Sequence, residues 1–335
     1  MSRGTPILYI PGIMGSQLYT PEDGKKIWFS PAAVLTDSER LDISSDLAVK
    51  NNGIDLQTKK PIQREYGVLK QDILLIEWLC SMFPDTPVYF FSYDFRKSCR
   101  KAAAELHEQI ERIIADGAES VNIVCHSMGG LVTSAYVSRC GTRRLNKVVM
   151  LGVPFEGSHE ILRIYLTGNL REIPNMVIET VGITREMLAG FPSLAELMPT
   201  KRLLAAHPLE MDGHALSGVD QEILIASKIP ETYVEARVFQ REVRSGFAQL
   251  KDMQNCYFGI GTGKTTLETI RLFASGKNPE MIETREGDGQ VLTDSALMGG
   301  DLCLEDPQVR AFPVHHSNLL RHPNVLKWIT DCLNE

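Results

Sequence analysis

Ser127 is the residue of this sequence best suited to act as a nucleophile. It follows a short run with the β-branched residues Val121, Ile123 and Val124, which is typical of a strand buried on both faces. Glycines and helix-compatible residues come after it, which predicts a nucleophile elbow between strand and helix. The helix N-terminus would favour developing negative charge. Cys125 replaces the first glycine of the usual Gly-x-Ser-x-Gly pattern, and an ordinary N-cap serine is the simpler alternative.

Two further groups could complete a catalytic triad with this serine. Asp288 lies between two glycines, as in a tight turn, and the pair His315 and His316 follows the last predicted strand. Serine is a poor nucleophile until a neutral imidazole takes its proton, and a carboxylate fixes the imidazole tautomer. Each residue alone has a plain structural explanation, since most such aspartates only cap turns. Their order along the chain, however, is that of α/β hydrolases.

Acyl transfer also needs donors for the oxyanion of the tetrahedral intermediate. The first predicted strand, 7–10, ends in a glycine-containing turn, which leaves backbone N–H groups free at its carboxyl end. We therefore expect the backbone amides of Ile13 and Met128 to form an oxyanion hole, each contributing on the order of 3 kcal/mol. An ordinary turn after the strand is the alternative.

These residues can meet only if the intervening elements form a parallel sheet. Apolar runs predict buried strands at 7–10, 88–91, 121–124, 148–151, 256–260 and 311–314. Helical spacing predicts helices over 66–83 and 98–116, after the serine, and at the C-terminal end. Such alternation implies right-handed βαβ units and a mostly parallel sheet flanked by helices, an α/β-hydrolase fold.

The alternation stops at Phe155, and the next hundred or so residues are helical in pattern and rich in leucine and methionine. We interpret 155–250 as a helical cap inserted after the strand that follows the nucleophile helix. The core then comprises 1–154 and 251–335. Most apolar residues of the cap would form its own small core, and a minority would make an apolar roof over the site, suited to an acyl chain.

Composition excludes several classes of function. The net charge of −7 argues against a nucleic-acid partner. The start has no apolar signal region, and no stretch is long enough to span a bilayer, so at most a transient contact with a membrane surface is expected. Seven scattered cysteines without a Cys-x-x-Cys pair argue against a disulfide framework or a zinc site. We expect a cytoplasmic protein; the sequence does not indicate its oligomeric state.

The segment Gly259–Thr265 is similar to a phosphate-binding loop, which raises nucleotide binding as an alternative. The Walker pattern requires a glycine five positions before Gly263, where this chain has Phe258. An apolar helix does not follow at once. A strand that ends in a glycine turn explains the segment better.

Several motifs together resemble the lecithin:cholesterol acyltransferase family, which includes phospholipid:diacylglycerol acyltransferases and lysosomal phospholipases. They are residues 11–18 (PGIMGSQL), 93–96 (YDFR), 126–130 (HSMGG), 287–291 (GDGQV) and 316–320 (HSNLL). The second and fourth motifs are the more specific ones. The resemblance spans most of the chain and is weakest in the cap.

The resemblance implies Ser127 as nucleophile, Asp288 as acid and His316 as base, because two residues separate His316 from the Leu-Leu pair as in the family. His315 remains the alternative base. It also implies the two oxyanion donors named above. Secreted relatives close their lipid-binding loop with a disulfide, whereas no cysteine of this chain precedes Cys80. Action on lipoproteins or in lysosomes is therefore not expected.

The sequence thus predicts a serine-dependent acyl ester hydrolase or acyltransferase that acts on a lipid or another small apolar ester, without cofactor or metal. Two alternatives belong to other classes. A non-catalytic binding module would keep the hydrolase scaffold and lose the chemistry. A nucleotide-binding protein would use the loop at Gly259–Thr265.

Overall fold

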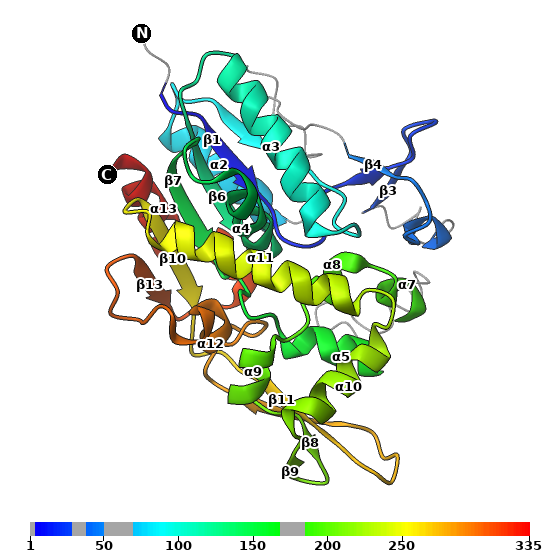
Figure 1. Cartoon of the computed structure of the whole chain (residues 1–335). Helices are drawn as coiled ribbons and strands as arrows, with labels where there is room; N and C mark the ends of the chain where they lie inside the picture. Colours follow the sequence, from blue (N-terminus) through cyan, green and yellow to red (C-terminus); the bar gives the residue numbers. More distant parts are fainter. Residues whose placement is uncertain (1–3, 29–37, 50–69, 168–184) are drawn as a thin grey trace.

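The centre of the computed structural model, which describes residues 4–28, 38–49, 70–167 and 185–335, is a sheet of six parallel strands (Figure 1). Their order across the sheet is β13-β10-β7-β6-β1-β5. The strands are β1 (Ile7–Ile10), β5 (Val88–Phe90), β6 (Val121–His126), β7 (Leu145–Leu151), β10 (Cys256–Gly261) and β13 (Val309–Phe312). All residues of β1 and β6 are buried, as expected for strands covered on both faces.

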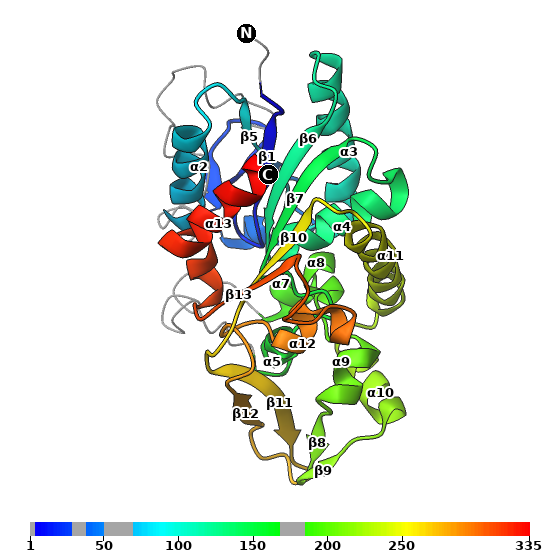
Figure 2. The ribbon, with the colours of Figure 1, turned by 90° about the vertical axis from the view of Figure 1, so that its left-hand side faces the viewer.

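Helices cover both faces of this sheet (Figure 2). On one face lie α3 (Cys99–Ala115), α4 (Met128–Cys140) and α11 (Tyr233–Lys251), and on the other α2 (Lys70–Met82) and α13 (Pro323–Asn334). Side chains of β1 alternate between the two apolar clusters: Leu8 and Ile10 join one, Ile7 and Tyr9 the other. The predicted parallel sheet between two helical layers is confirmed.

A small antiparallel sheet extends from the first strand. It contains β2 (Leu18–Tyr19), β3 (Lys26–Trp28) and β4 (Ala48–Val49), with the short helix η1 (Ser38–Leu41) between the last two. The fully buried guanidinium of Arg96 fixes it to the core: Arg96 pairs with Asp94 at 2.7 Å and donates to the carbonyls of Asp42 at 2.7 Å and Ser45 at 3.0 Å. The Tyr-Asp-Phe-Arg motif therefore has a structural role here. Residues 29–37 and 50–69, on either side of η1 and β4, lie outside the described residues.

The insertion after β7 lies at the carboxyl ends of the central strands (Figures 1 and 2). Its helices are α5 (His159–Thr167), α7 (Arg185–Ala189), α8 (Pro192–Glu196), α9 (Lys201–Ala206) and α10 (Gly218–Lys228). A second sheet, in the order β12-β11-β8-β9, contains β8 (Glu210–Met211), β9 (His214–Ala215), β11 (Thr266–Leu272) and β12 (Glu280–Thr284). Three short helices complete the description: α12 (Thr293–Ala296), η2 (Met298–Gly300) and η3 (His316–Leu320).

Elements assigned to the predicted core pack against elements of the predicted cap, on both sides of the boundary at residue 250. β11, which follows the predicted cap, pairs with β8 inside it on one side and with β12 on the other. Conversely, α11 packs along α4 of the core, and a Cβ at Gly246 would lie 1.8 Å from the carbonyl oxygen of Ser134. The division into a core and a cap at 155–250 stays a prediction.

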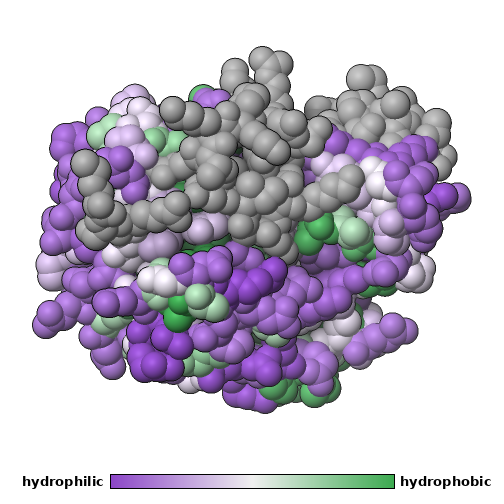
Figure 3. Space-filling model, turned by 90° about the horizontal axis from the view of Figure 1, so that it is seen from above, coloured by the Kyte–Doolittle hydropathy of each residue, from purple (hydrophilic) through white to green (hydrophobic). Residues whose placement is uncertain are grey.

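Among the coloured residues of the face seen in Figure 3, which views the molecule from above, most are hydrophilic and the apolar patches are scattered. Among the described residues, none of the helices has both the length and the apolar character of a transmembrane span.

Candidate active site

Ser127 forms the connection between β6 and α4. Its backbone dihedral angles, φ 52° and ψ −126°, are unfavourable for a residue with a side chain. Two hydrogen bonds hold this conformation: the Ser127 amide donates to Leu151 at 2.8 Å, and its carbonyl accepts from Gly130 at 2.9 Å. Ser127 occupies the N-cap position, but its side chain makes no capping hydrogen bond to α4. The hydroxyl is therefore not used as an ordinary cap.

Close backbone contacts explain why glycines surround this serine. A Cβ at Gly129 would lie 2.5 Å from the carbonyl oxygen of Ile10, so only glycine lets α4 begin this near β1. A Cβ at Gly12 would lie 3.0 Å from Cβ of Ser127. The loop after β1 is thus pressed against Ser127. Cys125, at the unusual position of the pattern, is fully buried, and burial raises the pKa of its thiol to about 12.

A second constellation joins the turn at Asp288 to η3. Oδ1 of Asp288 accepts from the amides of Gln290 at 3.0 Å and Val291 at 2.8 Å, while Oδ2 lies 2.7 Å from Nδ1 of His316. The His316 amide also donates to the carbonyl of Asp288 at 2.9 Å. Both side chains are almost completely buried. Because an ionised carboxylate only accepts, this contact favours the tautomer with the proton on Nδ1, which leaves Nε2 as the basic nitrogen.

The serine and the histidine line one small cavity of about 40 Å³. Its lining residues are Gly12, Ile13, Gly15, Gln71, Asp72, His126, Ser127, Gln290, His316 and Ser317. Asp288 reaches this cavity through the His316 ring. Met128 begins α4, so the helical ladder leaves its amide unused. His315 is exposed and does not line the cavity.

His126 belongs to this cavity although the sequence motifs predicted no role for its own side chain. Its Nε2 lies 3.3 Å from the carbonyl oxygen of His316, and the centres of the two rings are 4.7 Å apart. Burial, and then the nearby His316, lower the pKa of His126 well below its ordinary value. A neutral His126 therefore supports the His316 segment without adding a second positive charge.

Asp72 is the other unforeseen residue of the cavity. It lies in the first turn of α2, is 1% exposed, and accepts a hydrogen bond from the hydroxyl of Tyr9. Burial raises the pKa of its carboxyl from 3.8 to about 7. The only sequence signal was a polar residue within the helix predicted over 66–83, and that pattern is too common to indicate a site.

The loop that is similar to a phosphate-binding loop serves the turn at Asp288 instead. Residues 262–265 lead from β10 into the strand β11, so the helix N-terminus that a Walker loop requires does not follow. The Lys264 amide donates to the carbonyl of Gly287 at 2.8 Å. A Cβ at Gly261 would lie 2.5 Å from Cβ of Asp288. This glycine turn therefore positions the carboxylate.

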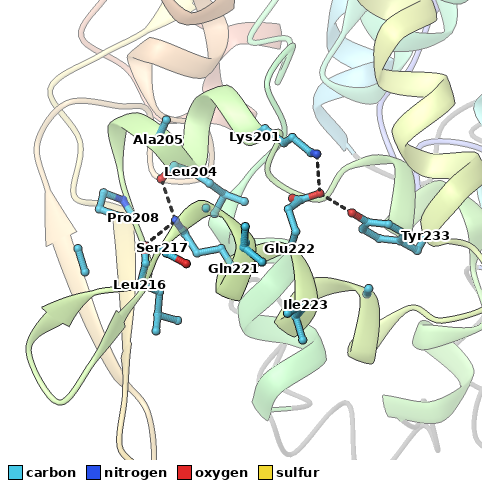
Figure 4. Close-up of a pocket in the computed structure, with 14 residues that line it drawn as sticks. Lys201, Leu204, Ala205, Pro208, Leu216, Ser217, Gln221, Glu222, Ile223 and Tyr233 are labelled. Carbon is cyan, nitrogen blue, oxygen red and sulfur yellow. Dashed lines mark hydrogen bonds and ion pairs between the residues drawn. The ribbon is translucent and has the colours of Figure 1, made fainter.

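A larger cavity, of about 880 Å³, lies in the insertion between α9, α10 and the start of α11 (Figure 4). Leu204, Leu216 and Ile223 give it an apolar lining, and Glu222 at its edge interacts with Lys201 and Tyr233. It shares no lining residue with the cavity at Ser127. The predicted apolar roof over Ser127 stays a prediction. Within the described parts of the chain, His, Cys, Asp and Glu side chains form no group that could hold a metal ion.

Comparison with known proteins adds to this geometry. A family model described as lecithin:cholesterol acyltransferase matches residues 70–241, just over half of the chain. The chain belongs to the lecithin:cholesterol acyltransferase family. The family match includes the Tyr-Asp-Phe-Arg motif and Ser127, and it ends before Asp288 and His316. The family predicted from the motifs is therefore confirmed. A search of curated proteins finds no match.

A search of solved structures finds further chains that are similar to this one. One, from "the crystal structure of Tle4-Tli4 complex", has a TM-score of 0.64 and 14% identity, over 100% of this chain and 99% of that chain. Another is the mature form of Bacillus licheniformis lipase BlEst2, with a TM-score of 0.45 and 10% identity, over 99% of this chain and 93% of that one. Identities this low concern the fold alone. The predicted α/β-hydrolase fold is confirmed.

Proposed function

We propose that this member of the family is a serine-dependent acyl ester hydrolase or acyltransferase with Ser127 as nucleophile, His316 as general base and Asp288 as the acid. One observation carries the proposal: the His316 ring, held by Asp288 at 2.7 Å, lines the same cavity as a serine on a strained strand-to-helix turn. The family supports ester hydrolysis or acyl transfer as the reaction class. His316 is preferred to His315 because only the former bonds to Asp288 among the described contacts.

The reaction then proceeds in two half-reactions. Nε2 of His316 takes the proton of the Ser127 hydroxyl while Oγ forms a bond to the ester carbonyl carbon, giving a tetrahedral oxyanion. The bond to the leaving alcohol breaks, and His316 returns the proton to that alcohol, which leaves an acyl-enzyme. Water or an acceptor alcohol repeats the sequence and releases the acyl group. Asp288 stabilises the imidazolium in both halves.

The backbone amides of Ile13 and Met128 are the proposed oxyanion donors. Ile13 lines the cavity beside Ser127, and Met128 supplies the first amide of α4, where the helix dipole adds to the stabilisation. Preorganised donors of this kind contribute about 3 kcal/mol each.

A fluorophosphonate probe tests the proposal. It should label the unsubstituted protein, and Ser127→Ala should abolish the label and the hydrolysis of p-nitrophenyl butyrate. Ser134→Ala is the matched control, because Ser134 is a buried serine of α4 whose hydroxyl only bonds to the Gly130 carbonyl. Equal labelling of Ser127→Ala and the unsubstituted protein would contradict the proposal. A protein that binds apolar esters without labelling or turnover would be the binding module.

For the substrate we propose a lipid or another apolar ester. The insertion at the carboxyl ends of the strands supports this, because its apolar helices lie on the side where the substrate must enter. A series of p-nitrophenyl esters should show activity on short to medium acyl chains, whereas activity on acetate alone would argue against it. Adding an acceptor alcohol to the assay separates transfer from hydrolysis: transfer forms the new ester at the expense of the free acid.

We also propose that the protein acts in the cytoplasm, without a nucleic-acid partner. All seven cysteines are free thiols, which suits a reducing compartment, and the net charge is negative. Fractionation of the native cells tests this location.

A further inference from the structure

The two carboxyl oxygens of Asp72 differ in their hydrogen bonding. Its Oδ1 accepts from the Tyr9 hydroxyl, whereas its Oδ2 is buried and has no hydrogen-bond partner among the described residues. Leaving a buried carboxyl oxygen unpaired costs free energy, so natural proteins rarely do this without a reason. Asp72 lies within the cavity that also contains Ser127 and His316. The unpaired oxygen therefore belongs to a side chain that lines the same cavity as the reacting groups.

The rest of this cavity suits the alcohol part of an ester. His316 must return its proton to the leaving oxygen, so the leaving alcohol lies on the histidine side. Gln71, Gln290 and Ser317 line the same cavity as His316 and Asp72, and all are polar. A purely alkyl alcohol would form no hydrogen bond with this polar lining. An alcohol that carries further hydroxyl groups would do so.

Charge distinguishes a hydroxyl from an ammonium group as the partner of Asp72. His316 becomes positively charged in each half-reaction, and the His126 ring lies 4.7 Å from it. A substrate cation in the same cavity would oppose formation of the imidazolium. A neutral hydroxyl can donate to Oδ2 without that cost.

We infer that Asp72 is a specificity residue: its Oδ2 accepts a hydrogen bond from a free hydroxyl on the alcohol part of the substrate, and the preferred substrates are partial esters of polyols. This inference rests on the proposed function, because it assigns the alcohol side of the same site. Tyr9 holds the carboxyl in place through Oδ1.

Two butyrate esters with the same carbon skeleton test it: glycerol 1-butyrate and n-propyl butyrate. The measured quantity is the ratio of their kcat/KM values on one preparation, so partial loss of folded protein cancels. At pH 8, above the Asp72 pKa of about 7, the unsubstituted protein should prefer the glycerol ester. Asp72→Leu should lower the ratio on the order of 10- to 100-fold, as expected for a hydrogen bond to a charged group. Turnover of n-propyl butyrate should persist. The control is Glu77→Leu, an exposed acid of the same helix, which should leave the ratio unchanged.

If Asp72→Leu does not fold, the double variant Tyr9→Phe with Asp72→Leu replaces both members of the buried pair by apolar groups and should give the same loss. Three results would overturn the inference: no preference in the unsubstituted protein, a ratio within about twofold of it in both variants, or a preference for butyrylcholine that Asp72→Leu removes. The last would identify a cationic alcohol instead. Turnover of none of the esters, with no probe on Ser127, would refute the proposed function as well.

Discussion

Replacing Asp288 by Asn should disable the proposed relay while leaving the fold intact. The two backbone amides at Gln290 and Val291 hold one carboxylate oxygen at 3.0 and 2.8 Å, and they can hold an amide oxygen in the same way. The amide nitrogen then takes the place of Oδ2, 2.7 Å from Nδ1 of His316. Because that nitrogen donates, Nδ1 must accept, and the imidazole proton moves to Nε2. His316 then presents a proton to Ser127 when it should remove one.

The magnitude follows from this inversion of the tautomer. The same substitution in a serine-protease triad lowers kcat about 10⁴-fold, which corresponds to roughly 5 kcal/mol of transition-state stabilisation. Thermal stability should change little, since the substitution Asp288→Asn keeps the size of the side chain and both backbone hydrogen bonds.

The assay is kcat for p-nitrophenyl butyrate together with the rate of fluorophosphonate labelling and a melting curve. We expect both rates to fall by several orders of magnitude while the melting curve stays near that of the unsubstituted protein. A folded Asp288→Asn variant that keeps more than about a tenth of kcat would refute the argument, because a reversed imidazole cannot act as the base.

Three further substitutions have results that the geometry determines. Gly129→Ala should destabilise the protein by about 1–3 kcal/mol or more in urea unfolding, because its Cβ would meet a carbonyl oxygen at 2.5 Å. Gly218→Ala is the control: its Cβ meets nothing within 4 Å, so this substitution should be neutral or stabilising. Equal losses of stability in the two variants would contradict the prediction. Arg96→Met should cost about 3–5 kcal/mol in the same assay, since it removes the guanidinium at 2.7 Å from the buried Asp94 carboxylate and leaves it the Lys97 ammonium at 3.7 Å. The exposed Lys327→Met should cost little. Asp72 has a folded pKa of about 7 against an ordinary 3.8, so its contribution to stability is full below pH 4 and is lost as the pH rises to 7. The stability of Asp72→Asn relative to the unsubstituted protein should therefore rise by about 4 kcal/mol between pH 4 and 8, and a flat difference would be inconsistent with that shift.

Buried strands and amphipathic helices were predictable because the type and the spacing of their apolar residues indicate which side chains are buried. Errors arise where polar residues are buried or apolar ones stand alone. β7 begins at Leu145, three residues before the predicted start. The prediction began too late because it did not foresee that Lys147 is buried, with its ammonium donating to the Leu333 carbonyl. β13 ends at Phe312, two residues before the predicted end; only its first and last residues, Val309 and Phe312, are buried. Such a strand lies at the edge of the sheet.

The candidate site was predictable in its residue types and less so in its details. The choice between His315 and His316 depends on which way one turn residue faces, and that orientation is set by contacts with the distant turn at Asp288. Asp72 could not be predicted, since its role depends on burial beside Tyr9, 63 positions away. In the second sheet, β8 and β9 were missed because they have two residues each, too few for a periodic pattern.

The chain leaves the central sheet after Gly261, forms the hairpin β11–β12, and comes back beside Lys264 at Gly287, immediately before the proposed acid Asp288. The hydrogen bond from Lys264 to Gly287 closes the neck of this excursion at 2.8 Å. The Gly289 amide adds a second link, because it donates to the hydroxyl of Thr266 at the start of β11 at 2.8 Å. Both hydrogen bonds lie at the base of the hairpin, so we expect changes in length at its far end, where β11 pairs with β8, to leave the turn at Asp288 unchanged.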